Sequence, residues 1–228
     1  MKPELRRFGD EQAPIVVVDE FSGRLDDILE IAERLSPYPA PQGNYYPGLR
    51  RFIEPSDEAA SAYVAQTCED AAPFIGGAFG VDDFTLTEAS FSMVTTPPSK
   101  LSRPQRAPHF DSPDPKHYAL LHYLRVPEGS GTAFYRQRST GIERVTEANI
   151  AHFVTTAERE AARLEPDSGY IFGSDRFFEQ IGAVEAVADR LIVYQGGLLH
   201  SGIIPPAMNF STDPREGRLT ANLFVRGN

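Results

Sequence analysis

The segment QRAPHFDSPDPKHYALLHYL, residues 105–124, decides how the rest of this chain is interpreted. It holds three of the five histidines, and the first of them, His109, is followed two positions later by Asp111. Residues two apart in an extended segment point to the same side, so this imidazole and this carboxylate project together. The run HYALLHYLRV that follows is apolar and predicts a buried strand. The pattern therefore predicts two potential metal ligands just ahead of a buried strand.

A third potential ligand lies far downstream, in the run RLIVYQGGLLHSGII at residues 190–204. This run is strand-like, and His200 is an isolated imidazole among its apolar residues. Two imidazoles and one carboxylate suit a non-haem Fe(II) ion that keeps open coordination positions. The chain has one cysteine, Cys68, which excludes a cysteine-rich zinc site. Taken one at a time, His109 also fits a solvated loop residue, and His200 fits a hydrogen-bonded core histidine.

Outside these runs, the periodicity predicts helices early in the chain and mostly strands later. Helices are expected over residues 23–36, 57–78 with Ser56 as the N-cap, and 146–164. A turn-rich loop is expected over residues 40–53. Strands are expected over residues 13–21, 84–96, 117–126, 131–136, 169–172, 190–196, 197–204 and 219–227. This order favours an α+β fold in one domain over residues 1–228, with a helical part at 1–82 and a strand-rich core at 83–228.

Composition limits the classes of function. The chain of 228 residues carries a net charge of −10 and its basic residues are scattered, so we expect no nucleic-acid partner. No apolar run reaches the roughly 20 residues of a membrane helix, so we expect no membrane partner. The opening MKPELRRFGDEQ has no apolar core, so we expect no secretory signal. These features favour a cytoplasmic protein that acts on a small molecule, a peptide or a protein. The oligomeric state stays open, with a homodimer as one alternative.

The order of the motifs resembles that of the Fe(II)/2-oxoglutarate-dependent dioxygenase superfamily, most closely its prolyl-4-hydroxylase-like branch. The sequence shows HFD, LLHYLR, GSGTAFY, RLIVYQGGLLH and GRLTANLFV in the order of that branch. The likeness covers about Phe91 to Val225, and the whole chain is also similar to an uncharacterised bacterial family within the superfamily. It implies a double-stranded β-helix, which is a distorted jelly roll of two facing sheets, with the N-terminal helices packed on the outside.

The resemblance also implies the residues of an active site. His109, Asp111 and His200 would hold iron and form the catalytic centre, and 2-oxoglutarate would be the cosubstrate. The far carboxylate of 2-oxoglutarate needs a cation, and the planar fork of an arginine suits it. The residues at the family's positions for this role are Arg218, Thr220 and Tyr123. The loop between His200 and Arg218 is longer than this branch usually has, so Arg226, on the same strand face, stays an alternative anchor.

The motifs do not disclose what such an enzyme would hydroxylate: an amino acid, a peptide or protein side chain and a small metabolite all fit. Two other interpretations stay open. One is a cupin-like metalloenzyme that does not use 2-oxoglutarate, and it predicts no role for Arg218. The other is a non-catalytic binding module on a jelly-roll scaffold. We further expect His122 to be structural. The arginines of residues 136–144 are expected in a solvated hairpin or, as an alternative, around an anionic group of the substrate.

Overall fold

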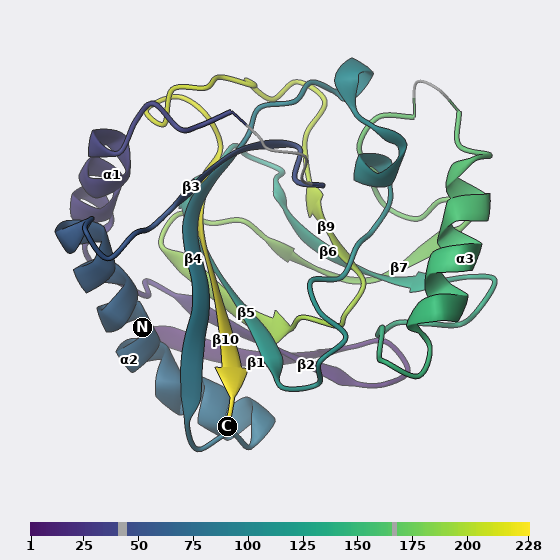
Figure 1. Cartoon of the computed structure of the whole chain (residues 1–228), viewed down its shortest axis with the longest axis horizontal. Helices are drawn as coiled ribbons and strands as arrows, with labels where there is room; N and C mark the ends of the chain where they lie inside the picture. Colours follow the sequence, from purple (N-terminus) through teal and green to yellow (C-terminus); the bar gives the residue numbers. More distant parts are fainter. Residues whose placement is uncertain (41–44, 166–167) are drawn as a thin grey trace.

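Two antiparallel sheets form the centre of the molecule and face each other (Figure 1). The computed structural model describes residues 1–40, 45–165 and 168–228. The larger sheet has the strand order β1-β2-β8-β5-β10-β4-β3, and the smaller has β7-β6-β9. The strands are β1 Lys2–Phe8, β2 Ala13–Asp19, β3 Gly48–Phe52, β4 Phe84–Val94, β5 His117–Arg125, β6 Gly131–Gln137, β7 Phe178–Glu185, β8 Arg190–Gln195, β9 His200–Ile203 and β10 Leu219–Gly227. The helices are α1 Leu25–Arg34, α2 Glu58–Phe79 and α3 Ile150–Ala161.

The helices cover the outer faces of the two sheets. α1 and α2 lie along the larger sheet, and α3 lies beside the smaller one (Figure 1). Apolar residues at helical spacing explain this packing, because Ile28 and Ala32 of α1 join Tyr63 of α2 in a core against the larger sheet. Phe153 of α3 belongs to a separate core that includes residues of β6 and β7. The structure therefore confirms the α+β fold with helices outside facing sheets.

The face of the larger sheet that looks toward the smaller sheet has two unlike halves. Over β2, β5 and β8 it is apolar, and Val17, Leu121 and Ile192 pack with Phe134 and Val184 of the smaller sheet. Over β3, β4 and β10 it is mainly polar, with Phe52 and Phe224 as its aromatic residues. We call this half the polar inner face, and the residues that project from it are Arg50, Ser90, Ser92, Thr220 and Asn222. Polar side chains are costly to bury without partners, so this half is suited to a polar ligand rather than to a dry core.

Most of the expected strands are confirmed, and one is wrong. Residues 169–172 form no strand. Gly169 and Gly173 border this run with φ values of 67° and 68°, which interrupt an extended backbone. The strand in this part of the chain is β7, which starts nine residues further on. Partial exposure along both of its faces weakens the alternation that predicts a strand.

The N-terminal part holds more strands than its sequence indicates. β1 was not expected, and it pairs with β2 along its whole length. The loop expected over residues 40–53 contains β3, whereas residues 41–44 of it lie outside the described residues. α2 has Asp57 as its N-cap instead of Ser56. Strands from residues 1–82 thus share one sheet with strands from residues 83–228.

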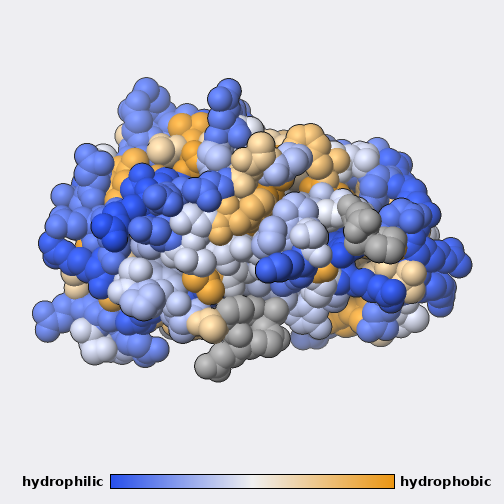
Figure 2. All heavy atoms as spheres, turned by 90° about the horizontal axis from the view of Figure 1, so that it is seen from above, coloured by the Kyte–Doolittle hydropathy of each residue, from blue (hydrophilic) through white to orange (hydrophobic). Residues whose placement is uncertain are grey.

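Seen from above, hydrophilic side chains dominate the left and right ends of the molecule, and hydrophobic side chains gather in small patches near its middle (Figure 2). Within the described ranges, no helix combines the length and the apolar character that a membrane span requires.

His122 is structural and faces the helices. Its ring is fully buried, with Nε2 3.0 Å from Asp189 Oδ1 and Nδ1 2.8 Å from the Tyr63 hydroxyl. The carboxylate of Asp189 also accepts hydrogen bonds from the hydroxyl and backbone N–H of Ser22 and from the N–H of Gly23. Burial lowers the pKa of His122, so the ring is neutral, donates from Nε2 to Asp189 and accepts at Nδ1 from Tyr63. This network ties α2 to β5 and to the turn before β8.

Candidate metal centre

Backbone hydrogen bonds hold the segment before β5 against the start of β9. The N–H of His109 donates to the carbonyl of His200 at 2.9 Å, and the N–H of His200 donates back at 2.8 Å. The N–H of Asp111 donates to the carbonyl of Gly196 at 2.7 Å. Gly196 must lack a side chain, because a Cβ there would clash with the ring of His117. The turn between β8 and β9 therefore brings together residues that are far apart in sequence.

The side chains of this segment and of β9 converge. Nitrogen and oxygen ligand atoms of His109, Asp111 and His200 all lie within 4.8 Å of one another. His200 Nε2 is 3.6 Å from Asp111 Oδ2, and the two imidazole rings have centroids 4.4 Å apart. Ligand atoms at this spacing leave room for one ion that each of them would approach to about 2 Å.

Two features of the hydrogen bonding fit a metal cation. Asp111 Oδ2 is buried and accepts no hydrogen bond from any residue of the described ranges. Such an oxygen is costly without a partner, and a cation would supply one. His200 Nδ1 lies 2.8 Å from the carbonyl of Leu198, so Nδ1 carries the proton and the lone pair of Nε2 is free to coordinate. The three residues therefore fit the metal that the sequence predicts.

The electrostatics of His109 also suit a ligand. Solvent reaches this side chain, whereas His200 is 5% exposed. The protein surrounds His109 closely enough that burial lowers its pKa well below the usual value, and the His200 imidazole and the Arg50 guanidinium lower it further. A neutral imidazole is the form that binds a metal, so the lone pair of His109 stays available across the neutral range.

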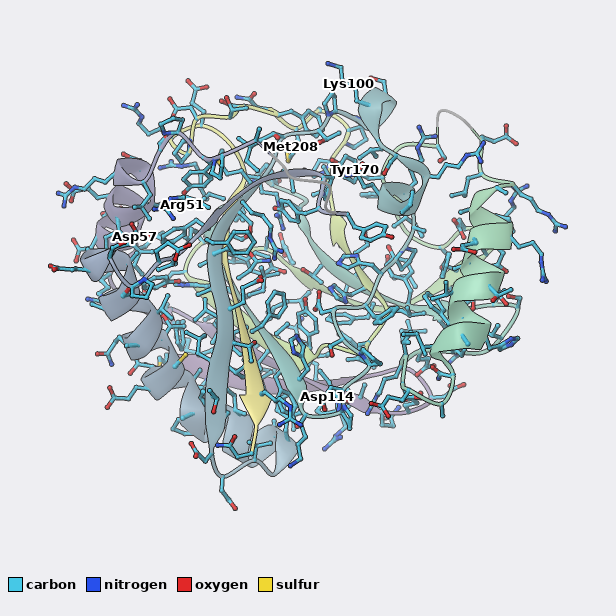
Figure 3. All side chains as sticks on the ribbon, viewed as in Figure 1. Arg51, Asp57, Lys100, Asp114, Tyr170 and Met208 are labelled. Carbon is cyan, nitrogen blue, oxygen red and sulfur yellow. The ribbon has the colours of Figure 1, made fainter. Side chains whose placement is uncertain are left out.

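Arg218, just before β10, is a buried arginine without an anionic partner. It is 5% exposed, its Nε has no hydrogen-bond partner, and no carboxylate in the described part of the chain forms an ion pair with it. Its guanidinium carbon lies 6.0 Å from the ring centroid of Tyr123. A cavity of about 150 Å³ borders Arg218 and is also lined by Met208, which Figure 3 labels near the top of the molecule. A buried cation of this kind suits an anionic group supplied by a ligand.

The other two residues expected around the cosubstrate lie beside Arg218. Tyr123 is fully buried on β5, with its hydroxyl 2.7 Å from Thr132 Oγ1. Burial raises the pKa of Tyr123 to about 12, while Thr132 and Arg218 act in the opposite direction. Thr220 lies opposite Tyr123 in the pairing of β10 with β5, and its hydroxyl donates to Asn222 Oδ1 at 2.8 Å. The structure thus brings the three residues together.

Arg226, the alternative anchor, lies elsewhere. Its Nε donates to Asp114 Oδ2 at 2.7 Å, and its side chain is 53% exposed. Asp114 lies near the C-terminal end of β10 (Figure 3). The alternation of β10 continues through Phe224 and Val225, so Arg226 keeps the strand face of Arg218 but lies at the other, exposed end of the strand. Of the two arginines, Arg218 is the buried and unpaired one.

Two of the three arginines of residues 136–144 are paired with carboxylates, and Arg138 donates from Nε to the backbone carbonyl of Asp175 at 3.0 Å. Arg136 forms ion pairs with Asp10, Glu143 and Glu179. Arg144 lies 3.0 Å from Glu11. Glu143 is 2% exposed and also accepts hydrogen bonds from the backbone N–H groups of residues 10 and 11. These contacts fix the β1–β2 turn to the hairpin after β6, which is a structural role.

Sequence reasoning missed two residues near the centre. Tyr194 of β8 packs edge-on against His200, with ring centroids 4.8 Å apart. Burial raises the pKa of Tyr194 well above the usual value, and the Asp111 carboxylate adds to the rise. Alternation within RLIVYQ would have placed this tyrosine on the inner face. Arg50 lies within the loop predicted over residues 40–53. A loop does not fix the side to which a side chain points, whereas β3 places Arg50 on one face of the sheet.

Comparison with solved structures identifies the fold as that of the Fe/2-oxoglutarate dioxygenases. The non-heme alpha ketoglutarate dependent epimerase SnoN from nogalamycin biosynthesis matches with a TM-score of 0.57 at 13% identity, over 95% of this chain and 79% of that one. HygX from Streptomyces hygroscopicus, with nickel and 2-oxoglutarate bound, matches with a TM-score of 0.58 at 12% identity, over 96% and 84%. A Pseudomonas putida prolyl-4-hydroxylase matches with a TM-score of 0.50 at 16% identity, over 96% and 95%. At these identities the likeness establishes the double-stranded β-helix alone.

The chain belongs to the family described as "Family of unknown function (DUF6445)", whose model matches residues 1–225. No curated protein gives a significant sequence match. The activity has to be argued from the site itself.

Proposed function

We propose that this protein is an Fe(II)- and 2-oxoglutarate-dependent oxygenase that hydroxylates an amino acid, a peptide or protein side chain, or a small metabolite. In this proposal His109, Asp111 and His200 hold the iron. When bound, the iron supplies the oxidative chemistry, in which O2 is consumed, 2-oxoglutarate is converted to succinate and CO2, and one oxygen atom enters the substrate. The fold and the convergence of the three side chains support this assignment.

The observation that carries the proposal is the buried guanidinium of Arg218, which has no carboxylate partner among the described residues and whose Nε has no hydrogen-bond partner there. A buried charge without a partner is strongly destabilising, so this arginine requires a bound anion in the working protein. The far carboxylate of 2-oxoglutarate supplies one. A cupin-like enzyme that does not use 2-oxoglutarate would give Arg218 no role. A non-catalytic binding module would give no role to the converging side chains of His109, Asp111 and His200.

The neighbours of Arg218 would complete the binding of that carboxylate. The pKa of Tyr123, at about 12, keeps its hydroxyl protonated at neutral pH. A protonated hydroxyl can accept from Thr132 and donate to a carboxylate at the same time. Thr220 uses its hydroxyl to orient Asn222, so it shapes the pocket wall more than it binds charge. The protein's part is to position the cosubstrate and to hold its charge away from water.

The experiment compares Arg218→Ala with the parent protein by anaerobic titration of 2-oxoglutarate into the Fe(II) form, followed through its visible charge-transfer band. Breaking a buried charge pair costs about 3–5 kcal/mol, which corresponds to roughly two to three orders of magnitude in affinity. We expect Arg218→Ala to keep Fe(II) binding and to lose the band and succinate formation.

The matched control is Arg226→Ala, which removes an exposed arginine of the same strand. It is expected to leave the affinity for 2-oxoglutarate unchanged. If Arg226→Ala abolishes the band while Arg218→Ala does not, the anchor is misassigned. If neither variant alters the titration, the 2-oxoglutarate proposal is wrong.

A further inference from the structure

Arg50 lies in the middle of β3 and projects from the polar inner face. Its partner on β4 is Ser92, Ser92 lies opposite Thr220 on β10, and Thr220 lies opposite Tyr123 on β5. Directly opposed residues of a sheet share a face. Arg50 therefore shares the face of the side chains proposed to hold 2-oxoglutarate. Because β4 separates β3 from β10, the two backbones are about 10 Å apart.

Aromatic rings hold the guanidinium of Arg50 without using its hydrogen-bond donors. The rings are those of Tyr46, Phe52 and Phe224, whose centroids lie 5.3, 5.8 and 5.9 Å from Cζ. Nε donates a long hydrogen bond of 3.3 Å to Ser92 Oγ. The one carboxylate within ion-pair range among the described residues is that of Glu88, 3.6 Å from Nη1, which is beyond hydrogen-bond distance. Among the described residues, the two terminal nitrogens form no hydrogen bond, and the ion pair of Nη1 with Glu88 is long.

Two other arginines of the larger sheet form short ion pairs with carboxylates. Arg51, the next residue along β3, points the other way and pairs with Asp57 at 2.9 Å, next to α2 (Figure 3). Arg190 pairs with Asp19 at 2.5 Å. Arg50 differs because aromatic rings surround its guanidinium and because it projects from the polar inner face. Stacking of this kind orders a long side chain in advance, so less entropy is lost when it binds a ligand.

Ring contacts connect Arg50 with the segment that carries the candidate iron ligands. Its guanidinium carbon is 5.9 Å from the ring centroid of Phe224, and the Phe224 ring stacks on that of His117 with centroids 5.2 Å apart. His117 and Asp111 both lie against Gly196.

We propose that Arg50 binds a carboxylate of the primary substrate, so that the enzyme acts on an organic acid. This inference rests on the proposed function and names the substrate class for the same site. The far carboxylate of 2-oxoglutarate is assigned to Arg218, two strands away, which leaves Arg50 for a second anion. A guanidinium presents paired N–H groups that fit one carboxylate. The amide nitrogen of Asn222, partly exposed on the same face, offers that substrate a further donor.

The test observes Arg50 directly. Arginine Nε–H signals are recorded by NMR on the full chain loaded with Zn(II) and 2-oxoglutarate, and the Arg50 signal is identified by its loss in Arg50→Gln. Acetate serves as the carboxylate probe, and acetamide serves as its neutral counterpart of the same shape. We expect a saturable shift of the Arg50 signal with acetate and none with acetamide. The Arg51 signal should not respond, and Arg51→Gln should leave the Arg50 response intact.

A second measurement separates this inference from the proposed function. Arg50→Gln should bind 2-oxoglutarate within about threefold of the parent in the anaerobic Fe(II) titration, which corresponds to less than 1 kcal/mol. If Arg50→Gln loses 2-oxoglutarate as Arg218→Ala is expected to, Arg50 is a cosubstrate contact and the inference is overturned while the proposed function stands. It is equally overturned if acetate produces no saturable shift, if acetamide shifts Arg50 as acetate does, or if acetate binds only when 2-oxoglutarate is left out.

Discussion

Asp111 is the residue on which metal binding at the candidate centre depends most. It brings the one carboxylate of the ligand set, and its Oδ2 is buried without a hydrogen-bond partner among the described residues. Loss of groups that merely orient a ligand costs roughly 10- to 100-fold in metal affinity, so loss of the ligand itself should cost at least that. We predict that Asp111→Ala weakens Fe(II) binding by about 100-fold or more in an anaerobic titration.

The control for this prediction is Asp114→Ala, three residues further on. Asp114 pairs with Arg226 near the end of β10 and takes no part in the centre. Its loss should leave Fe(II) affinity within error of the parent. Equal binding by Asp111→Ala and by the parent would exclude Asp111 as a ligand.

At the level of elements, α2 is joined to the sheet by a polar contact as well as by apolar packing. The Tyr63 hydroxyl is the hydrogen-bond partner of His122 Nδ1, and both residues are buried. Tyr63→Phe keeps the ring and leaves a buried acceptor unsatisfied, at a cost of about 1–3 kcal/mol. We predict a loss of that size in the free energy of unfolding, measured with urea at pH 7.

Tyr118→Phe is the matched change for comparison. Tyr118 belongs to the same core, on β5, but its hydroxyl makes no hydrogen bond within the described ranges. Its replacement should alter the free energy of unfolding by less than about 0.5 kcal/mol. If the two variants unfold alike, the network around His122 does not stabilise the docking of α2.

At the level of the whole molecule, the larger sheet joins both parts of the chain. β1, β2 and β3 come from residues 1–82, and β2 pairs with β8 while β3 pairs with β4. A sheet shared in this way should not separate into independent parts, so we predict one cooperative unfolding transition for residues 1–228. Far-UV circular dichroism and tyrosine fluorescence, usable because the chain has no tryptophan, should give the same midpoint in urea. Two separated midpoints would mean that the parts fold as separate domains.

Local patterns in the sequence suffice to predict the order of most strands and to single out the candidate ligands. Periodicity of two fixes which side chains share a face, and it placed His109 with Asp111. It also singled out His200, because an imidazole in an apolar run stands apart from its neighbours. Such signals are local, and they survive in a single sequence without knowledge of what the segment packs against.

Other features of the site depend on contacts between distant segments, which a local pattern does not contain. Arg218 and Arg226 are equivalent by parity, and the difference arises because Arg218 is buried whereas Arg226 lies at the exposed end of β10 and pairs with Asp114 of another segment. The pairing of β3 with β4 shows that Arg50 points toward the interior. The sequence does not show this, because a short run with two adjacent arginines has no alternation of polar and apolar residues. Local pattern reports which residues can share a face. Pairing partners, which belong to other parts of the chain, decide which face is buried, which charge is neutralised and which is left for a ligand.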